Sequence, residues 1–322
     1  MKNHYRFFCV FLFFFLRINA QKTRDSLDFL TYKISENENY TYSKVKFSDL
    51  YKRLPFITMN TAKDMVNKEY YPFSLASMAS TALLIPLDPI INKNSRGLGK
   101  KLGFDYNHSY KKLGPLKIIP QNANSLIYFL GNGTSVILMS GGFATYGFLC
   151  KDYRAQSVSF QLFQSILVSG IFTQTLKRIT GRESPFIANE ENRKNSNWHL
   201  LPSFSAYQKE TSRYDAMPSG HLTTGIAAWI IIAENYPEKK WIKPLGFTIL
   251  GLMSFEMMQS GVHWISDYPI AILFGFLIGK NIAKSAIHKK SSLPENSKNK
   301  YKINFSSTSF LGYQTFGIEI KF

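Results

Sequence analysis

The sequence predicts an all-α fold: an antiparallel helical bundle of five to six core helices, followed by a small C-terminal β-hairpin. Apolar segments long enough to form helices follow one another through the second half of the chain. Short connections such as 151–155 and 235–242 make neighbouring helices antiparallel. After residue 302, apolar and polar residues alternate, which is the strand period. The predicted helices are 125–149, 156–176, 219–234, 243–259 and 269–284.

The N-terminal third is expected to lie outside this bundle. Residues 1–20 have the pattern of a secretory signal peptide, with basic residues before an apolar run. An uncleaved anchor is the alternative. Residues 21–70 read as a polar leader with at most one short helix. Cleavage after residue 20 leaves Cys150 as the single cysteine, so no internal disulfide is expected.

The segments before and after the bundle are less regular. Residues 71–91 are apolar but broken by prolines, and we expect them to pack on the bundle without crossing a membrane. Residues 92–114 are rich in lysine and glycine and predict a solvated basic loop. Residues 291–322 supply a polar linker and the β-hairpin. Glycines at 131–133 allow a bend in the first bundle helix.

Composition limits the partners. The chain has 322 residues, of which 45% are hydrophobic and 15% aromatic, and its net charge is +18. This composition suffices for a packed core, and the charge favours an anionic membrane surface or an anionic substrate. The basic residues are scattered and follow no nucleic-acid-binding motif, so nucleic acid is not expected as a partner.

The tetrapeptide Pro218-Ser219-Gly220-His221 precedes the apolar run 222–233. Proline and a small hydroxyl residue open a helix, whose first N–H groups and dipole suit an oxyanion. His221 then lies in the first turn, where it can donate or accept a proton. A capped helix with a surface histidine is the alternative.

His263 and Asp267 lie four residues apart, so one helical turn places both on the same face. The carboxylate can accept the Nδ1 proton of His263 and leave Nε2 free to attack an electrophile. Alternatively, the two side chains only satisfy each other's hydrogen-bonding groups and have no catalytic role.

Lys177 closes the second helix, and Arg182 follows Gly181, which breaks it. Cations are common at a helix C-terminus because they complement its dipole. In the functional interpretation, Lys177 and Arg182 face an anion site formed by Ser219 and Gly220. In an up-and-down bundle, all of these motif residues fall at the same end.

Together and in this order, these motifs resemble the type-2 phosphatidic acid phosphatase / vanadium haloperoxidase superfamily. The family pattern is Lys-x6-Arg-Pro, then Pro-Ser-Gly-His, then Ser-Arg-x5-His-x3-Asp. The resemblance covers about residues 125–285 and defines 71–290 as a phosphatidic acid phosphatase-like helical domain. The matching residues are Lys177, Pro185, 218–221, His263 and Asp267.

Two family arginines that contact phosphate are missing. Ser184 precedes Pro185, and the family's Ser-Arg pair is Glu256-Met257. Losing two cations weakens the binding of a doubly charged oxyanion by several kcal/mol unless another group substitutes. Arg182 lies two residues before the first missing arginine and could reach the site.

The resemblance implies a metal-independent phosphatase without a cofactor, acting on phosphate monoesters through a phosphohistidine. The substrate would be a phosphorylated lipid, a lipid diphosphate or a small phosphate ester. His263 would be the nucleophile, Asp267 would orient it, and His221 would protonate the leaving group. The phosphate would be held by Lys177, Arg182, Ser219 and Gly220. The alternatives are a weakened or inactive family member with a structural or binding role in the envelope, and a vanadium haloperoxidase in which His263 ligates vanadium.

The expected location is the cell envelope, with the protein exported, attached to the membrane, and its active site on the periplasmic or extracytoplasmic side. Lysines at 239–243 and 280–290 would then be cytoplasmic, as the positive-inside rule requires. A soluble periplasmic bundle is the alternative, because mean hydropathy is −0.13 and segment 156–176 contains several glutamines and serines. The insert 187–216 is either a lid or a loop folded over the bundle. The sequence predicts no oligomeric state.

Overall fold

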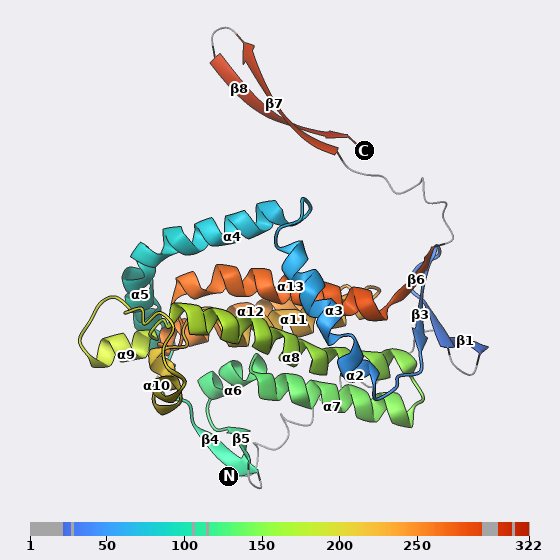
Figure 1. The fold of residues 1–322 in the computed structure, drawn as a ribbon, viewed down its shortest axis with the longest axis horizontal. Helices are drawn as coiled ribbons and strands as arrows, with labels where there is room; N and C mark the ends of the chain where they lie inside the picture. The colour runs from blue at the N-terminus through green and yellow to red at the C-terminus, as the bar shows by residue number, and fades with distance from the viewer. Residues whose placement is uncertain are drawn as a thin grey trace.

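The computed structural model describes residues 22–26, 29–104, 107–113, 116–291, 302–310 and 313–321. The predicted signal peptide lies outside these residues. Every predicted bundle segment is helical, and the helices run lengthwise beside one another (Figure 1). The predicted all-α bundle is therefore confirmed. Its helices are α6 (Ala123–Leu130), α7 (Gly133–Leu149), α8 (Tyr153–Thr180), α11 (Gly220–Asn235), α12 (Ile242–Gln259) and α13 (Tyr268–Ala286).

The core lies around α11, which packs against α8, α12 and α13. The contact of α11 with α13 is close because two glycines of α13 face α11. A Cβ added at Gly275 would lie 2.7 Å from the Cβ of Ile226, and a Cβ added at Gly279 would lie 2.7 Å from the Cβ of Ile230. Buried aliphatic side chains fill the rest of this core, among them Val158, Leu162, Ile231, Leu277, Ile278 and Ile282.

The glycine patch at 131–133 breaks the first bundle helix, as predicted. Helices α6 and α7 meet at an angle of 65°. A Cβ at Gly131 would lie 1.6 Å from the Sδ atom of Met253, so only glycine fits there. Asn132 caps α7 by accepting a hydrogen bond from the N–H of Ser135 at 3.0 Å.

The N-terminal region is more ordered than the predicted leader. Strands β1 (Lys22–Ser26), β2 (Phe29–Lys33) and β3 (Glu38–Ser43) form an antiparallel sheet with β6 (His288–Ser291), which follows α13. Helices α2 (Asp49–Lys52) and α3 (Leu54–Asp64) come next. The inward side chains alternate along the strands and form a second core with the end of α13. They are Leu30, Tyr32, Tyr40 and Tyr42.

The prediction of a solvated basic loop over residues 92–114 is wrong for most of that segment. Helix α4 (Tyr71–Leu84) continues through the short 3-10 helix η1 (Ile85–Leu87) into α5 (Asp88–Lys101). Pro86 and Pro89 do not end helical structure, because each lies in the first turn of a new helix, where its missing N–H costs nothing. A small hairpin of β4 (Tyr110–Leu113) and β5 (Leu116–Pro120) follows.

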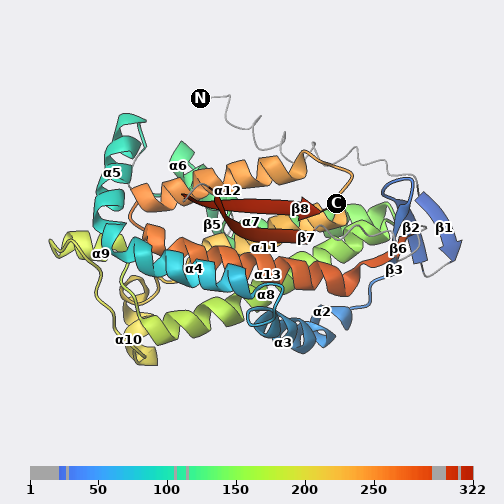
Figure 2. The same cartoon turned by 90° about the horizontal axis from the view of Figure 1, so that it is seen from above.

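Helix α4 packs along α13, as predicted (Figure 2), and it buries the side that is polar. Ser74, Ser77 and Thr81 are buried, whereas large apolar side chains including Leu75 and Met78 are more than half exposed. Water favours the opposite arrangement, and lipid favours this one. Helical segments 71–101 and 265–286 are each long and apolar enough to cross a membrane, and the bent pair α6–α7 would add a third. Segment 71–101 therefore has the length and composition of a span, which the proline-broken sequence of 71–91 did not lead us to expect. These features indicate membrane association.

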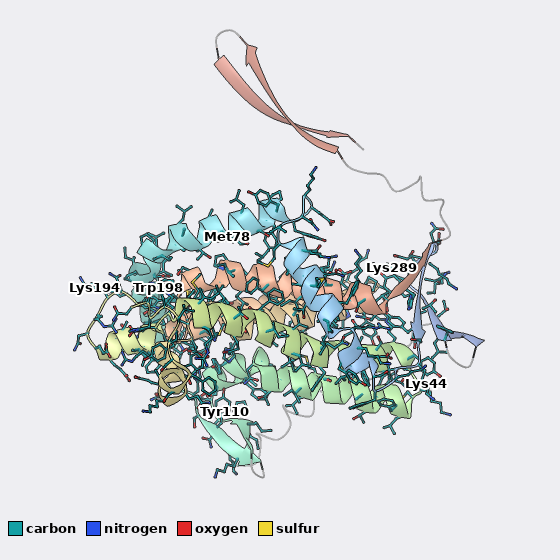
Figure 3. All side chains as sticks on the ribbon, in the orientation of Figure 1. Lys44, Met78, Tyr110, Lys194, Trp198 and Lys289 are labelled. Atoms are coloured by element: carbon teal, nitrogen blue, oxygen red, sulfur yellow. The ribbon has the colours of Figure 1, made fainter. Side chains whose placement is uncertain are left out.

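The predicted C-terminal hairpin is present. Strand β7 (Lys302–Phe310) pairs antiparallel with β8 (Tyr313–Lys321), from Lys302 opposite Lys321 to Phe310 opposite Tyr313. At one end of the bundle, the insert 187–216 contributes short helices. These are α9 (Pro185–Glu190), α10 (Phe204–Lys209) and η2 (Thr211–Arg213). Trp198 and Lys194 of this insert lie at that end, and Lys44 and Lys289 lie at the other (Figure 3).

Candidate active site

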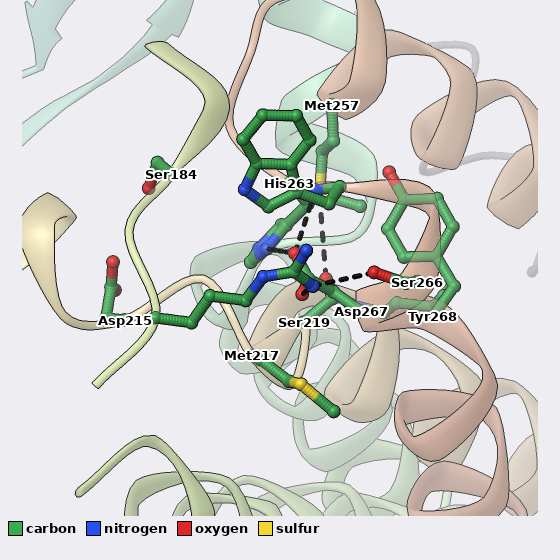
Figure 4. A network of polar contacts seen from close by, with 12 residues as sticks. Ser184, Asp215, Met217, Ser219, Met257, His263, Ser266, Asp267 and Tyr268 are labelled. Atoms are coloured by element: carbon green, nitrogen blue, oxygen red, sulfur yellow. Dashed lines mark hydrogen bonds and ion pairs between the residues drawn. The ribbon is translucent and has the colours of Figure 1, made fainter. Parts of the chain in front are cut away.

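The ends of four bundle helices bring the predicted motif residues together. Lys177 lies in the last turn of α8, Ser219 and Gly220 begin α11, and the loop from α12 to α13 carries His263. Asp267 ends the 3-10 helix η3 (Ile265–Asp267), directly before α13. Figure 4 shows His263, Asp267 and Ser219 in one cluster.

Lys177 and the start of α11 form one half of this cluster. A Cβ added to Gly220 would lie 3.7 Å from the Nζ atom of Lys177, so the buried ammonium sits against the first turn of α11. Ser219 caps this helix, its Oγ accepting from the N–H of Leu222 at 3.4 Å. The Nζ atom also donates to Oδ2 of Asp215 at 3.2 Å. Asp215 was not anticipated from the sequence.

His263 and Asp267 form the other half. Nδ1 of His263 lies 3.5 Å from Oδ2 of Asp267, and both side chains are buried. Oδ2 already accepts from the N–H of Trp264 at 2.8 Å. Nδ1 of His263 has no hydrogen-bond partner within the part of the chain that the structure describes. A small rotation of the imidazole would convert the ion-pair distance into a hydrogen bond, and such bonds are often long before substrate binds.

His221 lies between His263 and Tyr128. Its ring centroid is 6.3 Å from that of His263 and 4.7 Å from that of Tyr128. Burial is the main cause that lowers the pKa of His221 to about 3, and electrostatic interactions with His263, Lys177 and His108 act in the same direction. Without a bound anion, His221 is therefore neutral at physiological pH.

The structure places Arg182 behind Asp267 and not against the anion site. Its guanidinium donates to Oδ1 of Asp267 at 2.5 Å, to Oγ of Ser266 at 2.7 Å and to Oγ of Ser196 at 3.2 Å. It also donates to Oδ2 of Asp88 at 2.5 Å. These contacts do not favour the predicted role of Arg182 in holding a phosphate oxygen, because its donors already serve buried carboxylates.

Neither position of a missing arginine supplies a cation. The hydroxyl of Ser184 donates to the carbonyl of Ser212 at 2.9 Å. Met257 is fully buried, with its Sδ atom 3.9 Å from Oγ of Ser219.

Next to Met257, the buried carboxylate of Glu256 pairs with Nε2 of His108 at 2.7 Å. The ring of His108 stacks on Tyr128 with a centroid distance of 4.2 Å. The fold thus adds a histidine to the site that no motif spacing in the sequence indicates.

The insert is tied to the site by Glu183, which is fully buried. Its carboxylate binds Arg193 at 2.6 Å, Arg213 at 3.0 Å and His199 at 3.0 Å. Burial raises the pKa of Glu183, but hydrogen bonds from His199, Arg193 and the N–H of Asn197 outweigh it, so the net shift is downward. His199 thus contacts a buried carboxylate from within the insert.

The described residues contain no group of three or more His, Cys, Asp or Glu side chains arranged to hold a metal ion. The prediction of a metal-independent site therefore rests on the family resemblance.

The structure is thus a helical bundle in which the Lys-x6, Pro-Ser-Gly-His and His-x3-Asp motifs lie together at one end. Residues 159–289 match the model of the PAP2 superfamily, and this segment contains all the predicted site residues. This match agrees with the family resemblance that the order of the motifs predicted.

One solved structure that matches in the structural comparison is the first transmembrane PAP2-type phosphatidylglycerolphosphate phosphatase from Bacillus subtilis. The two chains share 14% sequence identity, the match covers 74% of this chain and 94% of that chain, and the TM-score is 0.32. No curated protein sequence matches this chain.

Proposed function

We propose that this protein is a phosphatase that hydrolyses phosphate monoesters through a phosphohistidine formed on His263. The proposal rests chiefly on one observation: the imidazoles of His221 and His263 lie side by side, 6.3 Å apart, next to Lys177 and the start of α11. One phosphoryl group can therefore contact two imidazoles, a cation and a helix N-terminus at once. These groups suit phosphoryl transfer, because they can supply a nucleophile, an acid and donors that stabilise the phosphoryl oxygens.

In the first step, Lys177, Ser219 and the N–H of Gly220 hold the phosphoryl oxygens. Nε2 of His263 attacks phosphorus, and the bond from phosphorus to the ester oxygen breaks. Asp267 accepts the hydrogen bond of the Nδ1 proton and stabilises the positive charge that develops on the ring. His221 donates its proton to the departing oxygen, which leaves as an alcohol.

In the second step, water attacks the phosphohistidine. His221, now neutral, accepts a proton from this water, and the bond between nitrogen and phosphorus breaks. Inorganic phosphate then leaves, His221 releases the proton that it took up on substrate binding, and the site returns to its state before substrate binding.

Substrate binding promotes the protonation of His221, which His221 needs in order to act as an acid. Its pKa of about 3 without ligand means that the ring is neutral before substrate arrives. A bound phosphate dianion favours the imidazolium, because an opposite charge at close range stabilises the charged form. Proton uptake is thereby coupled to the binding of the phosphate ester.

For the substrate class, we propose phosphorylated lipids or lipid diphosphates. The insert carries Leu200, Leu201 and Phe204, which are between 66% and 74% exposed, at the same end as the site. The outward apolar face of α4 supports this proposal, because such a face favours contact with lipid. A lipid phosphate would thus reach the site from the surrounding membrane, and a small soluble ester is the alternative. The cell envelope, with the site on the extracytoplasmic side, is the location that fits this substrate.

A second candidate function is a structural or binding role with little or no turnover. It is favoured by the absence of a cation at Ser184 and Met257 and by the engagement of Arg182 with carboxylates. The same features disfavour a vanadium haloperoxidase more strongly, because vanadate must stay bound between turnovers.

The test is phosphate release from a phosphatidate and from an aryl phosphate, measured in metal chelator from acidic to neutral pH. The wild type is compared with His263→Ala and with the control His288→Ala, an exposed histidine in β6 at the other end of the molecule. We expect chelator-resistant release that His288→Ala keeps and His263→Ala loses. Release that His263→Ala retains would refute the mechanism. A folded wild type that releases nothing from either ester would favour the structural role.

A further inference from the structure

Asp88 lies well outside the matched segment 159–289, yet it is buried against the candidate site. It begins α5 and is 3% exposed. Its Oδ1 accepts from the N–H of Ser266 at 3.1 Å, and its Oδ2 accepts from the Ser266 hydroxyl at 2.6 Å. Oδ2 also accepts from Nη2 of Arg182 at 2.5 Å. Asp88 is therefore connected to the residue that precedes Asp267 and to the arginine that binds Asp267.

Arg182 bridges the two carboxylates. Nη1 contacts Asp267, Nη2 contacts Asp88, and the guanidinium is 1% exposed. The rings of Trp198 and Trp264 lie 4.7 Å and 5.6 Å from its central carbon and keep water away. One buried cation is thus shared by two buried anions, and charges interact strongly where water is excluded.

This sharing has a consequence for Asp267. A single carboxylate paired with Arg182 would be neutralised by it and would be a weaker acceptor for the Nδ1 proton of His263. A second carboxylate on the other edge of the guanidinium takes part of that interaction and leaves the three groups with a net negative charge.

We propose that Asp88 is a positioning residue for the reaction of His263. It orients Arg182 and shares it, so that Asp267 keeps enough negative charge to hold the Nδ1 proton of His263. This inference rests on the proposed phosphohistidine function. It assigns a role in the site to a residue of the helical segment 71–101.

The competing explanation is that Asp88 only attaches α5 to η3. Two variants separate the explanations. Asp88→Asn keeps the shape and an oxygen for the N–H of Ser266 but removes the charge. Ser266→Ala removes the hydroxyl contacts to Asp88 and Arg182 but leaves the charges of both side chains in place. A charge effect predicts a larger loss in Asp88→Asn, whereas simple attachment predicts comparable losses in both variants.

In steady-state kinetics on a phosphate ester, we expect Asp88→Asn to lower kcat about tenfold or more. KM should change by less than about threefold, because Asp88 contacts no group that holds the phosphate. Ser266→Ala should keep kcat within about threefold of the wild type. A kcat for Asp88→Asn near the wild-type value, or equal losses in both variants, would overturn the proposal.

A second measurement does not require turnover. The ¹⁵N chemical shifts of labelled histidine in the full-length, detergent-solubilised protein report which ring nitrogen of His263 carries the proton. We expect the proton on Nδ1 in the wild type and in Ser266→Ala, and a shift of population toward Nε2 in Asp88→Asn. An unchanged tautomer in Asp88→Asn would overturn the role of Asp88 even in a protein without activity. Conversely, the expected shift without turnover would support it and count only against the phosphatase function.

If Asp88→Asn does not fold, Arg182→Lys provides the same test. A single ammonium group cannot contact both carboxylates with the two parallel bonds that a guanidinium makes. We expect the same change of tautomer in this variant, and a wild-type tautomer would overturn the proposal.

Discussion

Gly220→Ala should separate the stability of the fold from the binding of phosphate. A Cβ at this position would lie 3.7 Å from Nζ and 3.9 Å from Cε of Lys177, which is ordinary van der Waals contact. The folded protein can therefore accept the methyl group. An alanine in the first turn of α11 also restricts the unfolded chain, which stabilises the protein by about 0.4–1 kcal/mol.

The same methyl group occupies the space in which an oxyanion would lie. It stands between the ammonium of Lys177 and the N–H groups at the start of α11. Losing one such donor to a developing oxyanion costs about 2.7–4 kcal/mol, or roughly 10²–10³-fold in rate. Gly220→Ala is thus expected to melt at or above the wild-type temperature and to lose about 100-fold in kcat/KM.

The assay combines a thermal melt with initial rates on an aryl phosphate. Gly170→Ala is the matched control, because it makes the same change within α8. Apart from its chain neighbours and the backbone of its own helix, no described atom would lie within 4 Å of the added Cβ. The control should keep its activity. A Gly220→Ala variant with kcat/KM within about threefold of Gly170→Ala would refute the placement of the phosphate at this helix end.

Three further predictions concern charge. Lys177→Met should raise KM for a phosphate ester about 10–100-fold in initial-rate measurements, because it removes a charged hydrogen-bond donor of ~1.5–3 kcal/mol; an unchanged KM would count against Lys177 as a phosphate ligand. The lowered pKa of Glu183 means that its stabilisation is present above the ordinary value of 4.5 and is lost as pH falls below it. Thermal melts between pH 6 and pH 3 should show a smaller loss of stability in Glu183→Gln than in the wild type, and parallel curves would contradict this assignment. His221, whose pKa is lowered to about 3 from 6.5, should add a loss that begins as pH falls below 6.5, which His221→Gln abolishes.

The bundle and the gathering of the motifs could be predicted because their signals are local. Each helix is an apolar segment of adequate length, and each motif lies at the end of such a segment. Once neighbouring helices are antiparallel, Lys177, Ser219 and His263 must meet at one end, and the structure places them there.

The orientation of each helix could not be predicted as easily. The glutamines and serines of α8 suggested a soluble bundle, but Gln161, Gln164, Ser165 and Ser169 are buried. Phe163, Leu167 and Ile171 of the same helix are 37–49% exposed. A helix with its polar side inward has the same mean hydropathy as one with its polar side outward, so composition does not distinguish them.

Contacts between residues far apart in the sequence were missed for a different reason. Asp88 meets Arg182 and His108 meets Glu256 only after the chain has folded, and no spacing rule connects either pair. The sequence analysis assigned Arg182 to phosphate binding because Arg182 lies close to the position of a missing family arginine. The sequence did not reveal the buried carboxylates around Arg182, and these determine where a buried guanidinium lies.

The sheet that joins β3 to β6 affects the order in which the chain can fold during synthesis. Thr41 pairs with His288, so the two strands are separated by almost the whole helical bundle. At about 5–20 residues per second, the ribosome needs roughly 12–50 s to make the intervening chain. Throughout that time, the outer edge of β3 exposes unpaired N–H and C=O groups that another nascent chain can bind. Strand β6, which follows α13, pairs with this edge of β3. A ribosome that stalls before residue 288 therefore leaves the edge of β3 unpaired.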